Sequence, residues 1–316
     1  MTAKRRIFIT GGTGFFGKSI LSDWRNAPRP DTELVILSRA PDTFLADNPF
    51  FQGLREVSFI SGDVRNFTFP PGDFSAVIHA ATPATQLIAD KEMASIIIAG
   101  SKRVLEFCKA RSIPKLLYVS SGAVYGEMPV GVERMSESML CQPQTVYGKS
   151  KLYAENLCLD SGITCAIARC FAFVGEYLPL NLHFAVGNFI LDCLLHRPIR
   201  IKGDGSASRS YLYAGDLVCQ LWALLNCSKS HMIVNIGSDQ AISIRELAEL
   251  VRDCADSKNE IIVSNLPGIT RTSNCYIPDI SLARSLLKTG EPSSLEAALR
   301  QVICFHRNKL DLLKKH

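Results

Sequence analysis

A glycine-rich turn near the amino terminus constrains the fold more than any other feature of the chain. The run RRIFITGGTGFFGKSIL (5–21) has the pattern of a short apolar strand, a turn and an amphipathic helix. Gly12, Gly14 and Gly17 match G-x-G-x-x-G, and Gly11 adds an overlapping G-x-x-G-x-x-G register. Glycine is needed where a backbone turns tightly, approaches a pyrophosphate or packs a helix on a strand. Because helix amino termini attract anions, the turn predicts a dinucleotide site.

Strand and helix patterns alternate along the first half of the chain. Apolar strands are expected near 6–10, 33–38, 57–61, 75–80, 115–120 and 163–169, and helices near 14–26, 90–112 and 144–160. This alternation predicts an α/β fold, a Rossmann-type doubly wound parallel sheet with right-handed crossovers.

Beyond residue 170 the pattern loosens. Helices are expected near 183–196, 243–255 and 295–308, and short strands near 199–202 and 232–236. We therefore expect a dinucleotide-binding Rossmann domain over 1–170. A smaller α/β substrate lobe is expected over 171–316, with some segments interleaved back into the first domain.

Tyr147 and Lys151 lie in the run TVYGKSKLYAEN (145–156). In a helix, their four-residue spacing puts the phenol and the ammonium on one face, about a turn apart. A nearby positive charge favours phenolate, so Tyr147 is a candidate acid/base at neutral pH. Most isolated Y-x-x-x-K pairs are ordinary helix faces. Here, however, the strand in LLYVSSGAVYG (116–126) ends in Ser120 and Ser121, at the expected carboxyl edge of the sheet, so Ser121 is a candidate third member of a triad.

The segments TGGTGFFG, GDV, HAAT, SSGAVYG and YGKSK, in that order, resemble the extended short-chain dehydrogenase/reductases, in the branch acting on nucleotide-activated sugars. The resemblance runs nearly end to end and includes RSYLYAGDL (209–217) and YIPDISLARSLL (276–287). It implies that Tyr147 exchanges a proton with a sugar oxygen. Lys151 would hold the nicotinamide ribose and lower the tyrosine pKa, and Ser121 would hydrogen-bond the substrate carbonyl or hydroxyl.

The resemblance also implies a cofactor site, and the second strand indicates which cofactor. NAD-selective members carry an acidic residue at the end of that strand, but ELVILSRAP ends in Ser38 and Arg39. Arg39 suits a 2′-phosphate, with Ser38 as an extra donor, so NADP is favoured and NAD is the alternative. His79 is expected to be structural. The implied cofactor-binding residues are Gly11, Thr13, Gly14, Phe15, Phe16, Gly17, Ser38, Arg39, Asp63, Val64, Ala80, Ala81, Thr82, Tyr147 and Lys151.

The residues after Ser121 limit the reaction. Dehydratases of the branch carry Asp-Glu where this chain has Gly122 and Ala123, and UDP-sugar decarboxylases carry glutamate in place of Ala123. A 4-ketoreductase and a C4-epimerase both remain compatible, and Ser38-Arg39 favours the reductase. The resulting hypothesis is NADPH-dependent reduction of a nucleotide-linked 4-keto-6-deoxyhexose in deoxysugar biosynthesis. The alternatives are an NAD-dependent C4-epimerase and, less favoured because the triad is present, a non-catalytic dinucleotide-binding regulator.

Substrate residues are assigned by the same resemblance. Besides Ser121, Asn188 and Arg209 match positions that contact the nucleotide diphosphate, and Arg271 is a candidate second phosphate ligand. The expected partner is a CDP- or dTDP-linked sugar. The chain departs from the family where 169–172 lacks an asparagine and where Ser210 replaces an aspartate.

Composition restricts the remaining function classes. The formal net charge of +5 suits anionic ligands, but no Lys/Arg run indicates nucleic-acid binding. No apolar run is long enough to span a bilayer, and the basic amino terminus is not a signal peptide. The eleven cysteines show neither C-x-x-C nor zinc-ligand spacing, so we expect reduced thiols, no metal and a cytoplasmic location. The family resemblance, rather than composition, implies a homodimer through the helices near 90–112 and 144–160.

Overall fold

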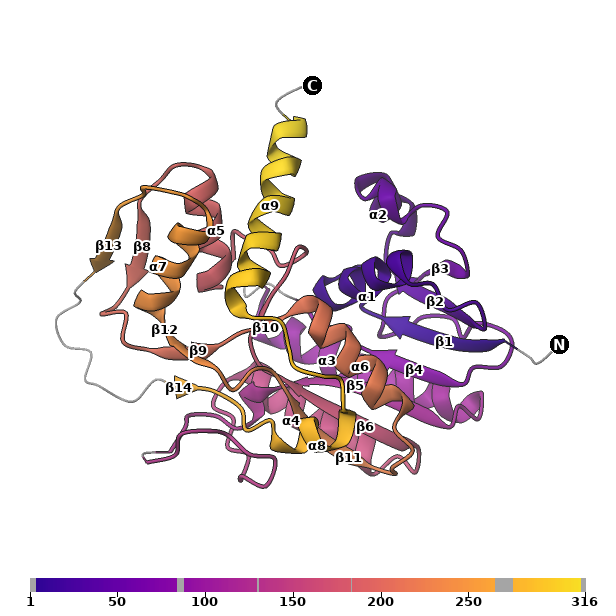
Figure 1. Cartoon of the computed structure of the whole chain (residues 1–316). Helices are drawn as coiled ribbons and strands as arrows, with labels where there is room; N and C mark the ends of the chain where they lie inside the picture. Colours follow the sequence, from indigo (N-terminus) through magenta and orange to yellow (C-terminus); the bar gives the residue numbers. More distant parts are fainter. Residues whose placement is uncertain (1–3, 84–87, 130, 183, 265–274, 314–316) are drawn as a thin grey trace.

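A seven-stranded parallel sheet is the centre of the computed structural model, which describes residues 4–83, 88–129, 131–182, 184–264 and 275–313 (Figure 1). Its order is β11-β6-β5-β4-β1-β2-β3, and every neighbouring pair is parallel. The strands are β1 (Arg5–Thr10), β2 (Thr32–Ser38), β3 (Val57–Ser61), β4 (Ala76–His79), β5 (Lys115–Ser121), β6 (Thr164–Cys170) and β11 (Met232–Ile236). The Rossmann-type α/β fold is confirmed.

Helices cover both faces of this sheet. Ile7 and Ile9 of β1 enter one core cluster and Phe8 enters the other, as expected for side chains that alternate along a strand. The first cluster takes its helical residues from α1 (Phe15–Asn26), α6 (Ala214–Asn226), α8 (Ser281–Leu287) and α2 (Pro41–Asp47). The second takes them from α3 (Asp90–Ala110) and α4 (Val146–Leu159). Two short 3₁₀ helices, η1 (Pro49–Phe51) and η2 (Gly122–Val124), complete this part.

The order of the strands reverses between β1 and β4. From β1 the chain proceeds to β2 and β3 on one side, and then returns to β4, β5 and β6 on the other. In such sheets ligands bind at the carboxyl ends of the strands beside the reversal. The glycine turn follows β1, the HAAT segment includes the end of β4, and Ser121 ends β5. These three segments therefore share one edge.

The smaller lobe lies beside the large sheet, and α9 (Leu295–Leu313) stands between them (Figure 1). Its core packs α9 with α5 (Ala185–Leu194) and α7 (Ile244–Cys254) on the parallel pair β8 (Ile199–Lys202) and β13 (Ile261–Ser264). Short strands connect the two parts: β7 (Phe173–Val174) pairs with β10 (Leu212–Tyr213), and β9 (Ser208–Ser210) lies between β12 (Ala241–Ser243) and β14 (Cys275–Tyr276).

The structure contains every expected helix and strand, with ends shifted by a few residues, and adds several that were not expected. The added helices are α2, α6 and α8, and the added strands have four residues or fewer. Such short strands are too brief to show a period of two. The assignment of 171–316 as a substrate lobe remains a prediction. Within this range, β11 lies in the large sheet. None of the helices in the described ranges is long and apolar enough to cross a membrane.

Candidate functional site

The glycine turn presents open backbone donors at the start of α1. The Gly14 N–H closes the turn by donating to the Gly11 carbonyl (3.0 Å), and Gly11 adopts a φ of +74°. A Cβ on Gly11 would lie 2.5 Å from the carbonyl carbon of Ala80, so the turn lies directly against the end of β4. No side chain caps α1, and its first turn carries no acidic residue. Unsatisfied N–H groups with a positive helix end are a suitable anion site.

The structure brings Ser121, Tyr147 and Lys151 together. Thr145 caps α4 by accepting from the Gly148 N–H (3.1 Å), which begins the helix one residue before Tyr147. Ser121 lies close enough to the Tyr147 phenol to affect its pKa, and the Ser121 side-chain oxygen accepts from the Ala123 N–H (3.2 Å). The predicted triad is thus a local cluster, formed by the end of β5 and one face of α4.

Lys151 is almost fully buried, at 3% exposure, and two oxygens hold its ammonium. The Nζ donates to Thr82 Oγ1 (2.7 Å) and to the Val119 carbonyl oxygen (2.8 Å). It lies 6.0 Å from the Tyr147 ring centroid. Burial lowers the pKa of Lys151 to about 8, against the opposing effects of Cys170 and Glu155.

The protonation of Tyr147 differs from the expectation that Lys151 lowers its pKa. Burial raises the pKa of Tyr147, and the nearby Ser121 side chain only partly opposes this. The reason is that the Lys151 ammonium is engaged by Thr82 and Val119 rather than by the phenol. Tyr147 therefore holds its proton at neutral pH, which is the state that a general acid requires.

His79 has a structural position, in agreement with the expectation. The Ser101 hydroxyl donates to the Ile97 carbonyl (2.7 Å), so it accepts from His79 Nε2–H (3.0 Å). His79 Nδ1 then accepts from the Thr10 hydroxyl (2.7 Å). Burial lowers the pKa of His79 to about 3, so the ring is neutral and ties β1, β4 and α3 together.

Ser38 and Arg39 occupy different environments at the end of β2. Ser38 is buried, and its hydroxyl accepts from the Ala40 N–H (3.3 Å). Arg39 is exposed and forms no ion pair within the described part of the chain. It nevertheless lies close enough to Asp63 to help lower the pKa of that carboxyl group.

Asp63 already has a partner that the sequence did not indicate. Arg65 Nε and Nη2 donate to its two carboxylate oxygens (2.8 and 2.9 Å), and this contact is the main cause of the lowered pKa of Asp63. Arg65 also donates to Glu92 on α3 (2.8 Å). The other residues of the predicted cofactor site follow β1, β3 or β4, among them Thr13, Val64, Ala81, and Phe15 and Phe16 on α1.

The predicted substrate residues are less closely connected. Arg209, on β9, pairs in register with Tyr276 on β14, and its charge acts on the Tyr276 phenol. Asn188 is half-buried on α5, and among the described residues no hydrogen bond joins its side chain to the triad. Arg271 lies outside the described residues. Arg209 is thus linked to the triad through Tyr276, which lies near both Arg209 and Ser121. Asn188 has no such link among the described residues.

Tyr276 begins the motif at 276–287, but it is not among the predicted site residues. Burial raises the pKa of its phenol, and the nearby Ser121 side chain opposes this shift. A Cβ on Gly122 would lie 2.5 Å from the Tyr276 hydroxyl oxygen, so glycine leaves the space that this oxygen fills. The Phe171 and Tyr276 rings pack together, with 4.7 Å between their centroids. The β9–β14 pairing and the contacts of the following residues with Met135 bring Tyr276 here, and a two-residue strand gives no sequence signal.

A buried ion pair supports the triad from behind. Arg169 Nη2 on β6 donates to Glu155 on α4 (2.7 Å), and the Ser120 hydroxyl also donates to Glu155. The two charged side chains are 5% and 1% exposed. Cys170, opposite Ser121 in the sheet register, is a neutral thiol because burial raises its pKa to about 12. These contacts fix α4, and with it Tyr147, against the sheet.

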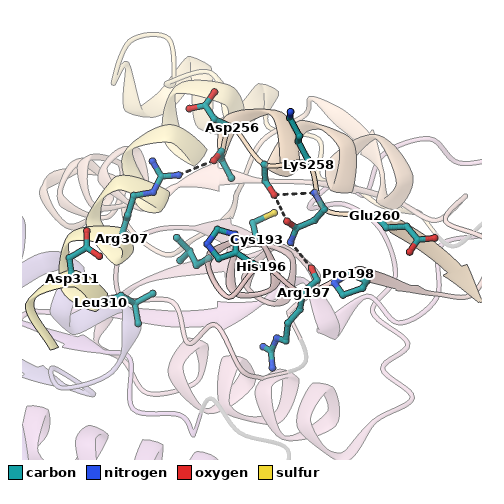
Figure 2. A pocket seen from close by; sticks show the side chains of 14 residues that line it. Cys193, His196, Arg197, Pro198, Asp256, Lys258, Glu260, Arg307, Leu310 and Asp311 are labelled. Carbon is teal, nitrogen blue, oxygen red and sulfur yellow. Dashed lines mark hydrogen bonds between the residues drawn. The ribbon is translucent and has the colours of Figure 1, made fainter. Parts of the chain in front are cut away.

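A cavity of about 540 Å³ lies elsewhere, in the smaller lobe (Figure 2). The carboxyl-terminal parts of α5, α7 and α9 surround it, and Arg307 closes one wall by donating to the Ala255 carbonyl (2.8 Å). Acidic and basic side chains alternate around it, including His196, Arg197, Asp256, Lys258 and Asp311. No predicted site residue lines this cavity. No metal-binding group of His, Cys, Asp or Glu occurs among the residues that the structure describes.

Known proteins of similar sequence modify nucleotide sugars. The chain is 27% identical to the uncharacterized UDP-glucose epimerase YtcB of Bacillus subtilis, over 95% of this chain and 97% of the relative. It is 29% identical to GDP-6-deoxy-D-mannose reductase of Pseudomonas aeruginosa, over 82% and 83%. It is 28% identical to UDP-glucuronic acid decarboxylase 1 of Xenopus tropicalis, over 98% and 73%.

Solved structures share the fold. The UDP-glucose 4-epimerase of Thermotoga maritima superposes with a TM-score of 0.81 at 21% identity, over 96% of this chain and 99% of that one. The UDP-glucuronic acid 4-epimerase of Bacillus cereus, in complex with NAD, gives a TM-score of 0.82 at 23% identity, with the same coverage. The model of the NAD dependent epimerase/dehydratase family matches residues 7–237, most of the chain and all seven strands of the large sheet from Ile7 onwards. The protein is therefore a member of the NAD-dependent epimerase/dehydratase family.

Proposed function

We propose that the protein is an NADPH-dependent reductase of nucleotide-diphosphate sugars, which converts a 4-keto-6-deoxyhexose into the 4-hydroxy sugar. The observation that carries this proposal is the grouping of Ser121 at the end of β5 with Tyr147 and the buried Lys151 on α4, the Lys151 Nζ lying 6.0 Å from the Tyr147 ring centroid. This cluster lies on the same sheet edge as the open amino terminus of α1. The arrangement suits transfer of a proton to an oxygen whose carbon receives hydride.

The proton steps follow from the positions of the three side chains. The backbone N–H groups of the glycine turn at the start of α1 would hold the pyrophosphate of a nicotinamide dinucleotide, which would supply hydride for the carbonyl carbon. Ser121 donates a hydrogen bond to the carbonyl oxygen and stabilises its developing negative charge. Tyr147 transfers its proton to that oxygen, which completes the hydroxyl group and leaves a phenolate whose ring centroid lies 6.0 Å from the Lys151 ammonium.

The end of β2 supports NADPH rather than NADH. This strand ends without a carboxylate, and the exposed Arg39 guanidinium has no ion-pair partner in the described ranges. Asp63, which would repel a nearby 2′-phosphate, is neutralised by Arg65. A free guanidinium forms charge-assisted bonds with phosphate oxygens.

Arg39→Ala is expected to weaken NADPH binding about 10- to 100-fold, the effect of losing a hydrogen bond to a charged group. NADH binding should change less than about twofold, because NADH lacks the 2′-phosphate. Titration calorimetry with both dinucleotides measures the difference. Arg111→Ala is the control, because Arg111 is an exposed arginine that directly follows the carboxyl end of α3. An equal loss for NADPH and NADH would contradict a role for Arg39 at the 2′-phosphate.

A C4-epimerase is the second candidate, and the comparisons favour it. Several similar structures are 4-epimerases of UDP-sugars, and two of those from Bacillus cereus contain NAD together with a sugar nucleotide. The same triad serves an epimerase, which removes and returns hydride at C4.

We also propose a homodimer through α3 and α4, whichever of the two reactions the protein catalyses.

Bound cofactor and turnover together distinguish the two functions. The supernatant of the denatured protein is analysed for NAD and NADP. NADPH and NADH are then each titrated with CDP-, dTDP-, UDP- and GDP-linked 4-keto-6-deoxyglucose. The reductase proposal predicts no retained NAD and rapid NADPH oxidation with one of these sugars. Stoichiometric retained NAD, with interconversion of two hexose epimers and no NADPH oxidation, would establish the epimerase instead.

A further inference from the structure

The Lys151 ammonium is held by one acceptor on each side. The Val119 carbonyl oxygen, within β5, accepts from the buried side (2.8 Å). Thr82 Oγ1, three residues after the end of β4, accepts from the partly buried side (2.7 Å). An ammonium has three N–H donors, so two are used by the protein and one remains for a ligand.

We propose that Thr82 is a positioning residue for Lys151, whose hydroxyl fixes the direction of the remaining N–H donor at the site. The proposal rests on the proposed function, in which Lys151 acts beside Tyr147. Lysine has a long flexible side chain, and a single acceptor at Val119 would leave the ammonium free to rotate about that bond. Two acceptors, one within β5 and one beyond the end of β4, together define one orientation of the Lys151 ammonium.

Threonine is well suited to this task. Its branched Cβ restricts χ1, so the hydroxyl is held in place rather than free to turn toward solvent. Thr82 also follows Ala80, whose carbonyl carbon lies against Gly11 of the glycine turn. The same short segment therefore contacts the turn at one end and the Lys151 ammonium at the other.

Among the described residues, no charged acceptor lies beside Thr82 on the same side of the Lys151 ammonium. Glu155 is engaged by Arg169 and Ser120, and the pKa of His79 near 3 keeps that ring neutral. The titratable groups that face Lys151 are His79 on β4, Tyr118 on β5, Cys170 on β6, and Tyr147, Glu155 and Cys158 on α4. Glu155 is the one carboxylate among them.

Thr82→Val keeps the shape of the side chain and removes the hydroxyl. It is expected to lower kcat/KM about 10- to 100-fold, with most of the loss in kcat, because a hydrogen bond to a charged group is lost. The oxygen that accepts from the ammonium favours the charged lysine, so its removal lowers the Lys151 pKa. The alkaline limb of the pH profile, where the charged lysine is lost, should therefore move down by about one pH unit.

Two further variants separate positioning from folding. Thr82→Ser retains the hydroxyl and should stay within about threefold of the wild-type kcat/KM. Thr164→Val makes the same change at a half-buried threonine at the start of β6, away from the triad, and should leave the pH profile unchanged. Thermal unfolding of each variant reports whether the fold is retained.

The proposal can fail independently of the reductase assignment. If the wild type neither reduces nor epimerises any sugar tested, the proposed function fails. Thr82 is then tested by NADPH affinity measured from pH 6.5 to 9.5. A loss of affinity that begins at lower pH in Thr82→Val than in Thr82→Ser supports the positioning role. Thr82→Val with wild-type affinity, kinetics and alkaline limb would overturn it.

Discussion

Replacing Tyr147 with phenylalanine is expected to lower kcat roughly 10²- to 10⁴-fold, the typical contribution of a positioned general acid. The phenol is the proton source of the proposed reduction, and burial keeps it protonated at neutral pH. Removing one oxygen from a side chain that packs in the core beside α3 leaves its shape unchanged. The unfolding temperature and the NADPH affinity should therefore stay close to wild type, while steady-state turnover falls.

Tyr153→Phe is the matched control, because Tyr153 lies on the same helix but is 46% exposed. It should retain wild-type turnover. If Tyr147→Phe keeps kcat within about tenfold, the proton comes from another group. Tyr276, the second phenol in contact with Ser121, would then be the donor. The double variant Tyr147→Phe/Tyr276→Phe would be inactive in that case.

Gly17→Ala is expected to destabilise the fold by about 3 kcal/mol or more, at the upper end of overpacking effects. A Cβ on Gly17 would lie 2.2 Å from the backbone carbonyl carbon of Gly12. Backbone cannot move aside as a flexible side chain can, so α1 would have to separate from the glycine turn. Urea unfolding monitored by circular dichroism measures the loss, as a lower midpoint at unchanged slope.

Gly14→Ala separates this packing effect from cofactor binding. A Cβ on Gly14 would meet only the Gly11 carbonyl oxygen, at 3.4 Å, and Gly14 has a φ of −85° that alanine adopts readily. Its stability should stay near wild type, while dinucleotide affinity falls, because Gly14 is exposed at the open end of α1. If Gly17→Ala is as stable as Gly14→Ala, the close helix–turn packing does not limit stability.

The large sheet could be predicted because its signals are local. Apolar runs bounded by turns identified β1 to β6, and the glycine turn identified the helix that follows β1. The return of the chain to this sheet was less visible. β11 is an ordinary apolar run, and only its pairing with β6 places it at the sheet edge. Pairing between distant segments depends on tertiary packing, which a linear pattern does not contain.

In the candidate site, too, local sequence patterns predict some residues, and contacts between distant segments bring in the others. Tyr147 and Lys151 lie four residues apart, so a helical pattern was enough to bring them together. The partners of these side chains come from other strands: Thr82 binds Lys151 from beyond β4, and Tyr276 reaches Ser121 from β14. The direction of the Tyr147 pKa shift also depended on burial and on the contacts of Lys151, neither of which the spacing reveals.

Transfer of deuterium from the cofactor to the sugar tests the central claim most directly. NADPH labelled at C4 of the nicotinamide is incubated with the protein and the 4-keto-6-deoxy sugar that it accepts, and the product is analysed by mass spectrometry and NMR. We predict one deuterium at sugar C4 for each NADPH consumed, and transfer that is slower by roughly 10²- to 10⁴-fold with Tyr147→Phe. Two results together would contradict the account and identify a C4-epimerase: no 4-keto sugar consumes NADPH, and the protein interconverts the two C4 epimers of a UDP-hexose without added NADPH.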